Sequence, residues 1–97
     1  MKLKENSRMV YEYVKEHQDE NITANDIEAA TGLTARQVNG IITMAFQRHK
    51  EEIDGEKVEV PLMKRVPAEV ELDDGTHKQV KLIKLTEEGM NLEIEAE

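Results

Sequence analysis

Residues 22–50 constrain the fold more than any other part of the chain, because they carry the signals of two helices and of the turn between them. Gly32, Leu33 and Thr34 supply the turn: a glycine that can end a helix in the left-handed conformation, an apolar anchor, and a hydroxyl that can cap the next helix. Upstream, Thr23 and Asp26 have the spacing of a carboxylate capping box, which predicts a helix over residues 24–31. We therefore expect two helices joined by a tight corner.

The second helix of this corner is expected over residues 34–49. Its apolar residues recur at the spacing of a buried helical stripe: Val38, Ile41, Ile42, Ala45 and Phe46. The remaining positions give an exposed side that is polar, cationic and rich in amides: Arg36, Gln37, Asn39, Gly40, Thr43 and Gln47. Residues 33–50 contain three basic side chains and no acidic one.

These residues resemble the helix-turn-helix motif of DNA-binding proteins. The match covers its core and turn positions, namely Ile27, Gly32, Leu33, Thr34, Val38 and Ile41. One position departs from the family, which usually has a small residue four places before the turn glycine, where the two helices come closest. This chain has Glu28 there. Either the helices cross farther apart, or Glu28 turns to solvent while Ala29 and Ala30 make the close contact.

The flanking segments extend the same pattern. Met9, Val10, Tyr13 and Val14 predict a first helix from Lys4 or Asn6 to His17, and residues 22–23 have the character of a short strand before the second helix. After residue 50, the acidic segment 51–60 is either a connection or a small hairpin turning at Asp54-Gly55. We favour an acidic, partly mobile connection, because Ile53 is its only apolar residue before Val58.

Residues 64–85 predict a long β-hairpin. Val66, Ala68, Val70 and Leu72 alternate with polar residues, and Asp74-Gly75 is a turn signal. The return strand runs from about residue 78 to residue 85. Its apolar phase shifts between Leu82 and Ile83, which indicates either a bulge or a point where both faces are buried.

The segment after this hairpin carries a second resemblance. Leu85, Thr86, Glu87, Glu88 and Gly89 predict a capped helical turn, and they resemble the segment that follows the wing in bacterial winged-helix regulators of the MarR type. Together the two resemblances imply an α+β winged helix-turn-helix fold. A three-helix core is followed by a β-hairpin wing, in a single domain spanning residues 1–97. The acidic tail, residues 90–97, has Leu92 and Ile94 for docking.

This resemblance implies that the helix over residues 34–49 lies in the major groove of duplex DNA. Arg36 is suited to guanine, Gln37 or Asn39 to adenine, and Thr43 to a thymine methyl group or a phosphate, while Gly40 allows a close approach. The alternative is that these residues are only the solvated face of an amphipathic helix. The full set expected to contact DNA is Thr34, Arg36, Gln37, Asn39, Gly40, Thr43, Gln47, Arg48, Lys50, Thr76, His77 and Lys78.

Two groups of residues are expected at phosphates, each with an alternative. Arg48, His49 and Lys50 lie at the end of this helix, where cations are also favourable through the helix dipole alone. Thr76, His77 and Lys78 are the part of the wing tip suited to the DNA backbone. Asp73 and Asp74, also at the tip, repel phosphate and are expected only to form the turn.

Composition excludes several classes of function. The chain has 97 residues and a net charge of −8. It contains no cysteine, which excludes disulfides, thiolate zinc sites and cysteine nucleophiles. His17, His49 and His77 are too far apart in sequence to suggest a metal site. We find no phosphate-binding loop or nucleophile motif and expect neither an enzyme nor a cofactor. No apolar run approaches a membrane span or a signal peptide, so we expect a cytoplasmic protein with no membrane partner.

Charge also raises a second hypothesis about partners. Our first expectation is double-stranded DNA bound by a homodimer, because one acidic domain offers few phosphate contacts; Met9, Tyr13 or the acidic tail are candidates for the dimer interface. The alternative is an acidic adaptor that binds a basic protein partner or mimics DNA. If the helix reads DNA, Arg36→Ala and Asn39→Ala should abolish binding while the fold survives. If the protein is an adaptor, charge reversals at Glu51, Glu52 and Glu56 should be the damaging changes.

Overall fold

The computed structural model describes residues 2–93 and has a mixed α+β architecture. Its elements in chain order are α1 (Glu5–Glu16), α2 (Ala24–Thr31), α3 (Ala35–Ile41), the π-helical η1 (Ile42–Gln47), β1 (Lys50–Ile53), β2 (Glu56–Glu59), β3 (Met63–Glu71), β4 (His77–Leu85) and α4 (Glu87–Met90). The predicted α+β class is confirmed. Residues 94–97 of the predicted tail, including Ile94, lie outside the described residues.

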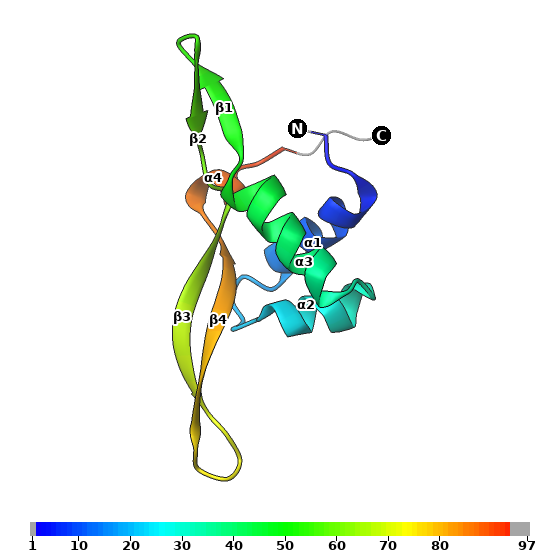
Figure 1. Cartoon of the computed structure of the whole chain (residues 1–97), viewed down its shortest axis with the longest axis vertical. Coiled ribbons are helices and arrows are strands. Elements are labelled where there is room, and N and C mark those ends of the chain that lie inside the picture. The colour runs from blue at the N-terminus through cyan, green and yellow to red at the C-terminus, as the bar shows by residue number, and fades with distance from the viewer. Residues whose placement is uncertain (1, 94–97) are drawn as a thin grey trace.

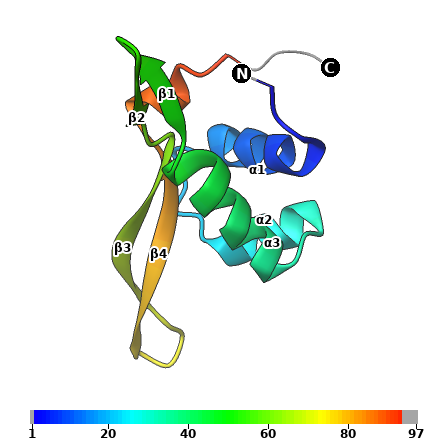
Figure 2. The same ribbon diagram turned by 45° about the horizontal axis from the view of Figure 1, so that its top comes forward.

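The helices pack together beside a long ribbon made by the two hairpins. Figures 1 and 2 show α1, α2 and α3 on one side of this ribbon, with β1–β2 and β3–β4 pointing in opposite directions. The molecule measures 53 × 26 × 23 Å as a result. Each hairpin is a separate two-stranded antiparallel sheet. The α3–η1 helix lies near the middle of the ribbon, between the two hairpin tips.

One hydrophobic core joins the helices to the base of β3–β4. Its side chains are mainly aliphatic, apart from Tyr11 and Phe46, whose ring centroids are 6.0 Å apart. The core residues come from nearly every part of the fold: Leu3, Val10, Tyr11, Val14, Ile22, Ile27, Val38, Ile42, Phe46, Leu62, Met63, Ile83 and Leu85. None of the helices in residues 2–93 combines the length and the apolar character needed to cross a membrane.

The predicted corner between α2 and α3 is confirmed. Gly32 ends α2 in the left-handed conformation at φ 78°, and its N–H donates to Glu28 O at 2.9 Å. Thr34 caps α3: its Oγ1 accepts from Gln37 N at 3.1 Å, while Gln37 Oε1 accepts from Thr34 N at 2.9 Å. The helix ends at this corner are therefore satisfied by local side chains.

Of the two alternatives for Glu28, the one in which it turns to solvent while Ala29 and Ala30 make the close helix contact is wrong. Ala29 and Ala30 are both exposed, whereas the Glu28 side chain is half-buried. Its Oε2 is buried without a hydrogen-bond partner in the part of the chain that the structure describes. The helix therefore turns Glu28, and not its small neighbours, partly inward.

The helix after the corner is α-helical only as far as Ile41 and then becomes π-helical. Val38, Ile42 and Phe46 are fully buried at a spacing of four residues. In an α-helix, eight residues overshoot two full turns by about 80°. The wider π-turn, seen in the Arg48 N–H donating to Thr43 O at 3.0 Å, offsets this drift and keeps all three side chains inward. The helix ends at Gln47, two residues before the predicted end.

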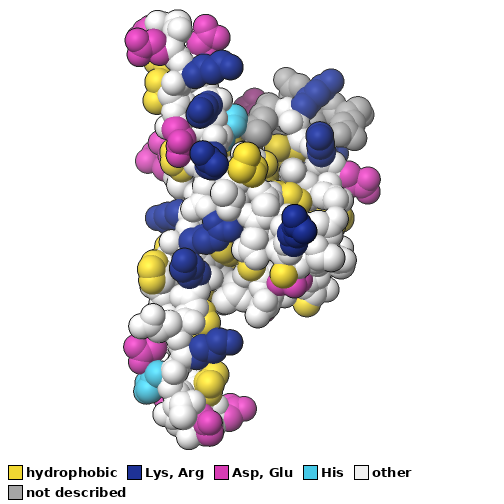
Figure 3. All heavy atoms as spheres, in the orientation of Figure 1, with side chains coloured by type: hydrophobic (Ala, Val, Ile, Leu, Met, Phe, Trp, Pro, Cys, Tyr) yellow, Lys and Arg dark blue, Asp and Glu magenta, His cyan; other side chains and the backbone are white. Residues whose placement is uncertain are grey.

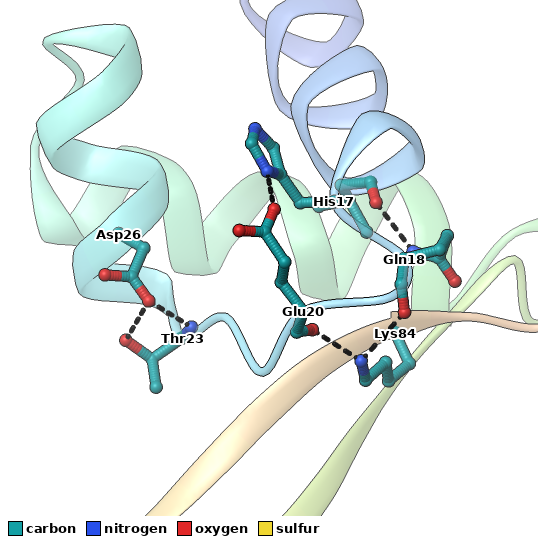
Figure 4. A network of polar contacts seen from close by, with 7 residues as sticks. His17, Gln18, Glu20, Thr23, Asp26 and Lys84 are labelled. Carbon is teal, nitrogen blue, oxygen red and sulfur yellow. Dashed lines mark hydrogen bonds and ion pairs between the residues drawn. The ribbon is translucent and has the colours of Figure 1, made fainter.

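The connection between α1 and α2 lies along β4 but forms no strand, so the short strand expected at residues 22–23 is wrong. Its place is taken by a single ladder contact, in which Ile83 N donates to Ile22 O at 2.9 Å. Lys84 reinforces this contact by donating to Gln18 O at 3.0 Å and to Glu20 O at 2.6 Å (Figure 4). The expected extended segment is thus tied to the hairpin mainly by a lysine side chain.

Residues 50–59 form the hairpin β1–β2, so the favoured acidic connection is wrong and its alternative is correct. Asp54 and Gly55 both have positive φ, 53° and 83°, which is the backbone of a type I′ turn. This turn sets the register Ile53↔Glu56 to Lys50↔Glu59, and all eight strand residues are exposed. Turn chemistry outweighs the shortage of apolar residues here.

The predicted hairpin over residues 64–85 is confirmed as β3–β4. Its register runs without interruption from Met63↔Leu85 to Glu71↔His77, which excludes a bulge between Leu82 and Ile83. Both side chains are buried, with exposed fractions of 9% and 1%. Successive residues point to opposite faces, so the shift in apolar phase marks the point where both faces of the strand are covered.

The short helix α4 closes the fold against the link between the hairpins. Its predicted cap is confirmed, because Thr86 Oγ1 accepts from Gly89 N at 3.1 Å. Thr86 also donates from its backbone N to Leu62 O at 3.0 Å and from its hydroxyl to Pro61 O at 2.6 Å. Tyr11 Oη donates to Gly89 O at 2.7 Å, and burial raises the pKa of Tyr11 above its usual value of 10.0.

Gly89 leaves no room for a side chain, so Gly89→Ala should destabilise the protein. A Cβ there would lie 2.0 Å from Leu62 O. We expect a loss of about 1–3 kcal/mol in the free energy of unfolding, measured by urea denaturation. Gly40→Ala is the matched control: a Cβ there meets nothing within 4 Å, so it should stabilise α3 by up to about 1 kcal/mol. Equal stability of the two variants would contradict this packing.

Candidate nucleic-acid interface

The outward side of α3 and η1 carries a stripe of four residues: Arg36, Gly40, Met44 and Arg48. They follow one another at intervals of four, the same spacing as the buried residues on the opposite side. All four are exposed, and Met44 has an exposed fraction of 65%. Arg48 Nη1 lies 3.9 Å from Met44 Sδ, which links the last two members of the stripe.

The charges around this stripe are predominantly positive although the chain is acidic. No carboxylate occurs between residues 33 and 50. Figure 3 shows Lys and Arg side chains following both hairpins on this face, with Asp and Glu side chains at the two hairpin tips and others along the upper hairpin and at the edges of the helices. The net charge of −8 is therefore unevenly distributed, and the region around α3 presents cations to an approaching polyanion.

Four of the predicted DNA-contacting side chains are used inside the protein. Thr34 and Gln37 satisfy each other's backbone N–H groups in the α3 cap. Asn39 Nδ2 donates to Ala35 O at 2.9 Å, and Asn39 Oδ1 accepts from Arg65 Nη2 at 3.2 Å. Gln47 Oε1 accepts from Arg65 Nη1. Their amides therefore position the helix and the β3–β4 hairpin.

Arg65 is the residue of this site that the sequence analysis missed. The alternation of Val66, Ala68 and Val70 placed it in the polar, solvated phase of β3. The structure instead places Met63, Arg65 and Ile83 on the face that meets the helices, with Val66 and Leu82 on the opposite face. Burial lowers the pKa of Arg65 below its usual value. The sequence offered one indication: Arg65 is two residues after the apolar Met63, and residues two apart in a strand share a face.

The other predicted residues of the helix and β1 differ in exposure. Arg36 and Gly40 are exposed, and no hydrogen bond or ion pair of the Arg36 side chain is found in residues 2–93. Thr43 is half-buried within η1. Lys50 is exposed at the start of β1, opposite Glu59. Arg36 is thus the predicted base-reading residue whose side chain is both exposed and not engaged elsewhere in the described part of the molecule.

At the tip of β3–β4, the two aspartates belong to the turn, as expected. Asp74 Oδ1 accepts from Thr76 N at 3.0 Å and from Thr76 Oγ1 at 2.6 Å, and these hydrogen bonds lower the pKa of Asp74. His77 Nδ1 lies 3.0 Å from Glu69 Oε1. Lys78 is exposed. Of the three predicted tip contacts, Lys78 is the one without a carboxylate partner in residues 2–93.

An open groove borders the flank of α3 that faces the N-terminal segment. Its volume is about 860 Å³, and its lining includes Lys2, Lys4, Arg36, Ile41 and Met44. Two further cations and one carboxylate, that of Glu5, therefore lie beside the outward stripe. These lysines could not be predicted to lie near Arg36, because they are more than 30 residues away from it in the chain.

The histidines do not form a common site. His17 pairs with Glu20, His49 lies 3.4 Å from Glu51, and His77 pairs with Glu69. Residues 2–93 contain no group of three or more His, Asp or Glu side chains that could hold a metal ion. Comparisons with protein-family models, curated proteins and solved structures each return no match to this chain. The candidate interface therefore stands on the chain's own geometry and charges.

Arg65 should couple β3–β4 to α3 energetically. We expect Arg65→Gln to lower the free energy of unfolding by about 1–2 kcal/mol, since charged hydrogen bonds to two amide side chains are lost from a partly exposed site. In a double-mutant cycle with Asn39→Ala, the coupling energy should be about 1 kcal/mol. The same cycle with Asn25→Ala, which removes no partner of Arg65, should be additive. Additivity in both cycles would contradict the coupling.

Proposed function

We propose that this chain is a winged helix-turn-helix protein of the cytoplasm that binds duplex DNA and acts as a regulator or accessory DNA-binding factor. Helices α1, α2 and α3 correspond to the three-helix core, and β3–β4 to the wing. The α2–α3 corner, with its left-handed Gly32 and the Thr34 cap, supports this assignment. In such a fold α3 enters the major groove.

One observation carries the proposal: the outward face of α3 and η1 has no carboxylate and is flanked by cations from the hairpins and the N-terminal segment (Figure 3). Most of the affinity for duplex DNA comes from cations that displace counterions from phosphates. An acidic protein can bind DNA only where its cations gather on one face. This chain has such a face around α3 and η1.

The contacts proposed within this face follow from which side chains are engaged elsewhere. Arg36 is suited to guanine, and Gly40 allows the helix backbone to approach the base edges. Arg48, Lys50 and Lys78 are suited to phosphates. Gln37 and Asn39, which the sequence analysis assigned to adenine, instead hold the helix and the wing in position through their internal hydrogen bonds.

Two copies would bind more strongly than one, because a symmetric site doubles the number of phosphate contacts. Met9 and Tyr13 on α1 remain our candidates for the dimer interface. Both are half-buried in the single chain.

A second candidate function is supported by the hairpin β1–β2. The cross-strand pairs Glu51↔Val58 and Ile53↔Glu56 put two carboxylates and two exposed apolar side chains on one face of this hairpin. That face fits a basic, partly apolar protein surface. If the chain is an acidic adaptor, charge reversal at Glu51, Glu52 and Glu56 is the damaging change.

Binding of random-sequence labelled duplex DNA, measured by fluorescence anisotropy over a range of salt concentrations, tests the first function. We expect binding that weakens with salt, and Arg48→Ala, which removes a proposed phosphate contact from the α3 face, should lower the slope of log K against log salt by about one. Lys15→Ala removes one positive charge from α1, where Lys15 lies over the Tyr11 ring, and serves as the matched control. It should leave the slope unchanged.

The opposite result has two forms. If no duplex binds at low salt, the DNA-binding proposal fails, and a pull-down with the wild type and the Glu51, Glu52 and Glu56 reversals tests the adaptor. If both substitutions change the slope equally, DNA binds without involving the α3 face in particular.

A further inference from the structure

We infer that Met44 is a second base-reading residue, which contacts the 5-methyl group of a thymine about three base steps from the base read by Arg36. The inference rests on the proposed function, and its test separates the failure of one from the failure of the other. Met44 was not among the residues expected from the sequence to touch DNA, since its place in the helical pattern did not set it apart.

The exposure of Met44 is the first observation. At 65% it is the most exposed large hydrophobic side chain in residues 2–93, ahead of Ile53 at 47%. A single exposed apolar side chain is ordinary on a protein surface. Met44 differs in its setting, because it stands among cations on the outward face of the helix proposed to enter the groove.

The helix geometry places Met44 in line with Arg36 and Gly40. The change from α-helix to π-helix after Ile41 keeps residues four apart on the same side, as the burial of Val38, Ile42 and Phe46 on the opposite side demonstrates. Without the wider turn, Met44 would be rotated by about 80° from Arg36. The three residues therefore form a row on one side of the helix, and all three line the open groove beside it.

Gly40 separates the two side chains and adds a second observation. A Cβ at Gly40 would meet no atom within 4 Å, so nothing inside the protein requires glycine there. Glycine within a helix nevertheless costs about 1 kcal/mol relative to alanine. A requirement from outside the molecule explains it: the smooth backbone at Gly40 lets a surface approach the helix between Arg36 and Met44.

The chemistry of the row matches the edges of base pairs. Arginine forms paired hydrogen bonds with guanine, and the thymine methyl group is the apolar feature of the major groove. Residues 36 and 44 are about 12 Å apart along the axis at 1.5 Å per residue, which corresponds to about three base steps. Arg48 Nη1, 3.9 Å from Met44 Sδ, flanks the thioether on the side of the phosphates proposed above. The row therefore fits a site with a guanine and a thymine about three steps apart.

The experiment replaces thymine by uracil, which removes only the methyl group. Duplexes that bind the wild-type protein are selected from a random library, and each thymine of the selected site is replaced in turn. We expect one replacement to weaken wild-type binding by about fourfold, the effect of one buried methyl group. Met44→Ala should bind the thymine and uracil duplexes within twofold of each other, and Met44→Leu should restore part of the difference.

Met90→Ala is the matched control, because Met90 is also exposed, at 43%, but lies on α4. It should respond to uracil as the wild type does. The inference is overturned if a selected duplex binds but tolerates uracil at every position, or if Met44→Ala keeps the full loss. If selection retains no duplex at all, the proposed function fails and this inference fails with it.

Discussion

The change from α-helix to π-helix after Ile41 fixes the direction of the η1 side chains relative to those of α3. It turns Val38, Ile42 and Phe46 into the core, where each is fully buried. It turns Asn39 and Gln47 to the same side, where one guanidinium, that of Arg65, contacts both. The remaining side is left for the outward row. A regular α-helix over the same residues would spread each of these groups around the helix.

The hydrogen bonds of Arg65 with Asn39 and Gln47 connect this helix to the β3–β4 hairpin. Arg65 comes from β3, so its contacts with α3 and η1 fix where the β3–β4 hairpin projects from the helices. The α1–α2 connection holds the neighbouring strand through Ile22 and Lys84. The hairpin is thereby held at its base from two sides, while its tip, where no core residue lies, extends along the 53 Å axis.

The carboxylates of the chain are unevenly distributed along the sequence. The carboxylates that give the chain its net charge of −8 lie mainly outside residues 33–50, and several occupy turns and helix starts that account for them structurally. Asp74 accepts two hydrogen bonds in its turn, and Glu87 and Glu88 begin α4. Such positions are favourable for carboxylates whatever the protein binds. Net charge is therefore a poor guide to what the α3 face binds.

The features that were predictable from sequence are those that depend on neighbours along the chain. The Gly32 corner, the Thr34 and Thr86 caps and the β3–β4 turn follow from local chemistry, and all are observed. The misses depend on distant contacts or on competing signals. Arg65 had no local reason to turn inward, and the π-turn, seen in the hydrogen bond from Arg48 N to Thr43 O, had no signal in the sequence. For β1–β2, the Asp54-Gly55 turn signal was present but was outweighed by the lack of apolar residues.

The most direct test of the account is nuclear magnetic resonance of the ¹⁵N-labelled protein titrated with duplex DNA. The claim that α3 binds DNA predicts amide shift changes concentrated at Arg36, Gly40 and Met44, with weaker changes at Lys78 and little change in α4. Shift changes confined to β1–β2, or none at DNA concentrations that saturate other DNA-binding proteins, would contradict it.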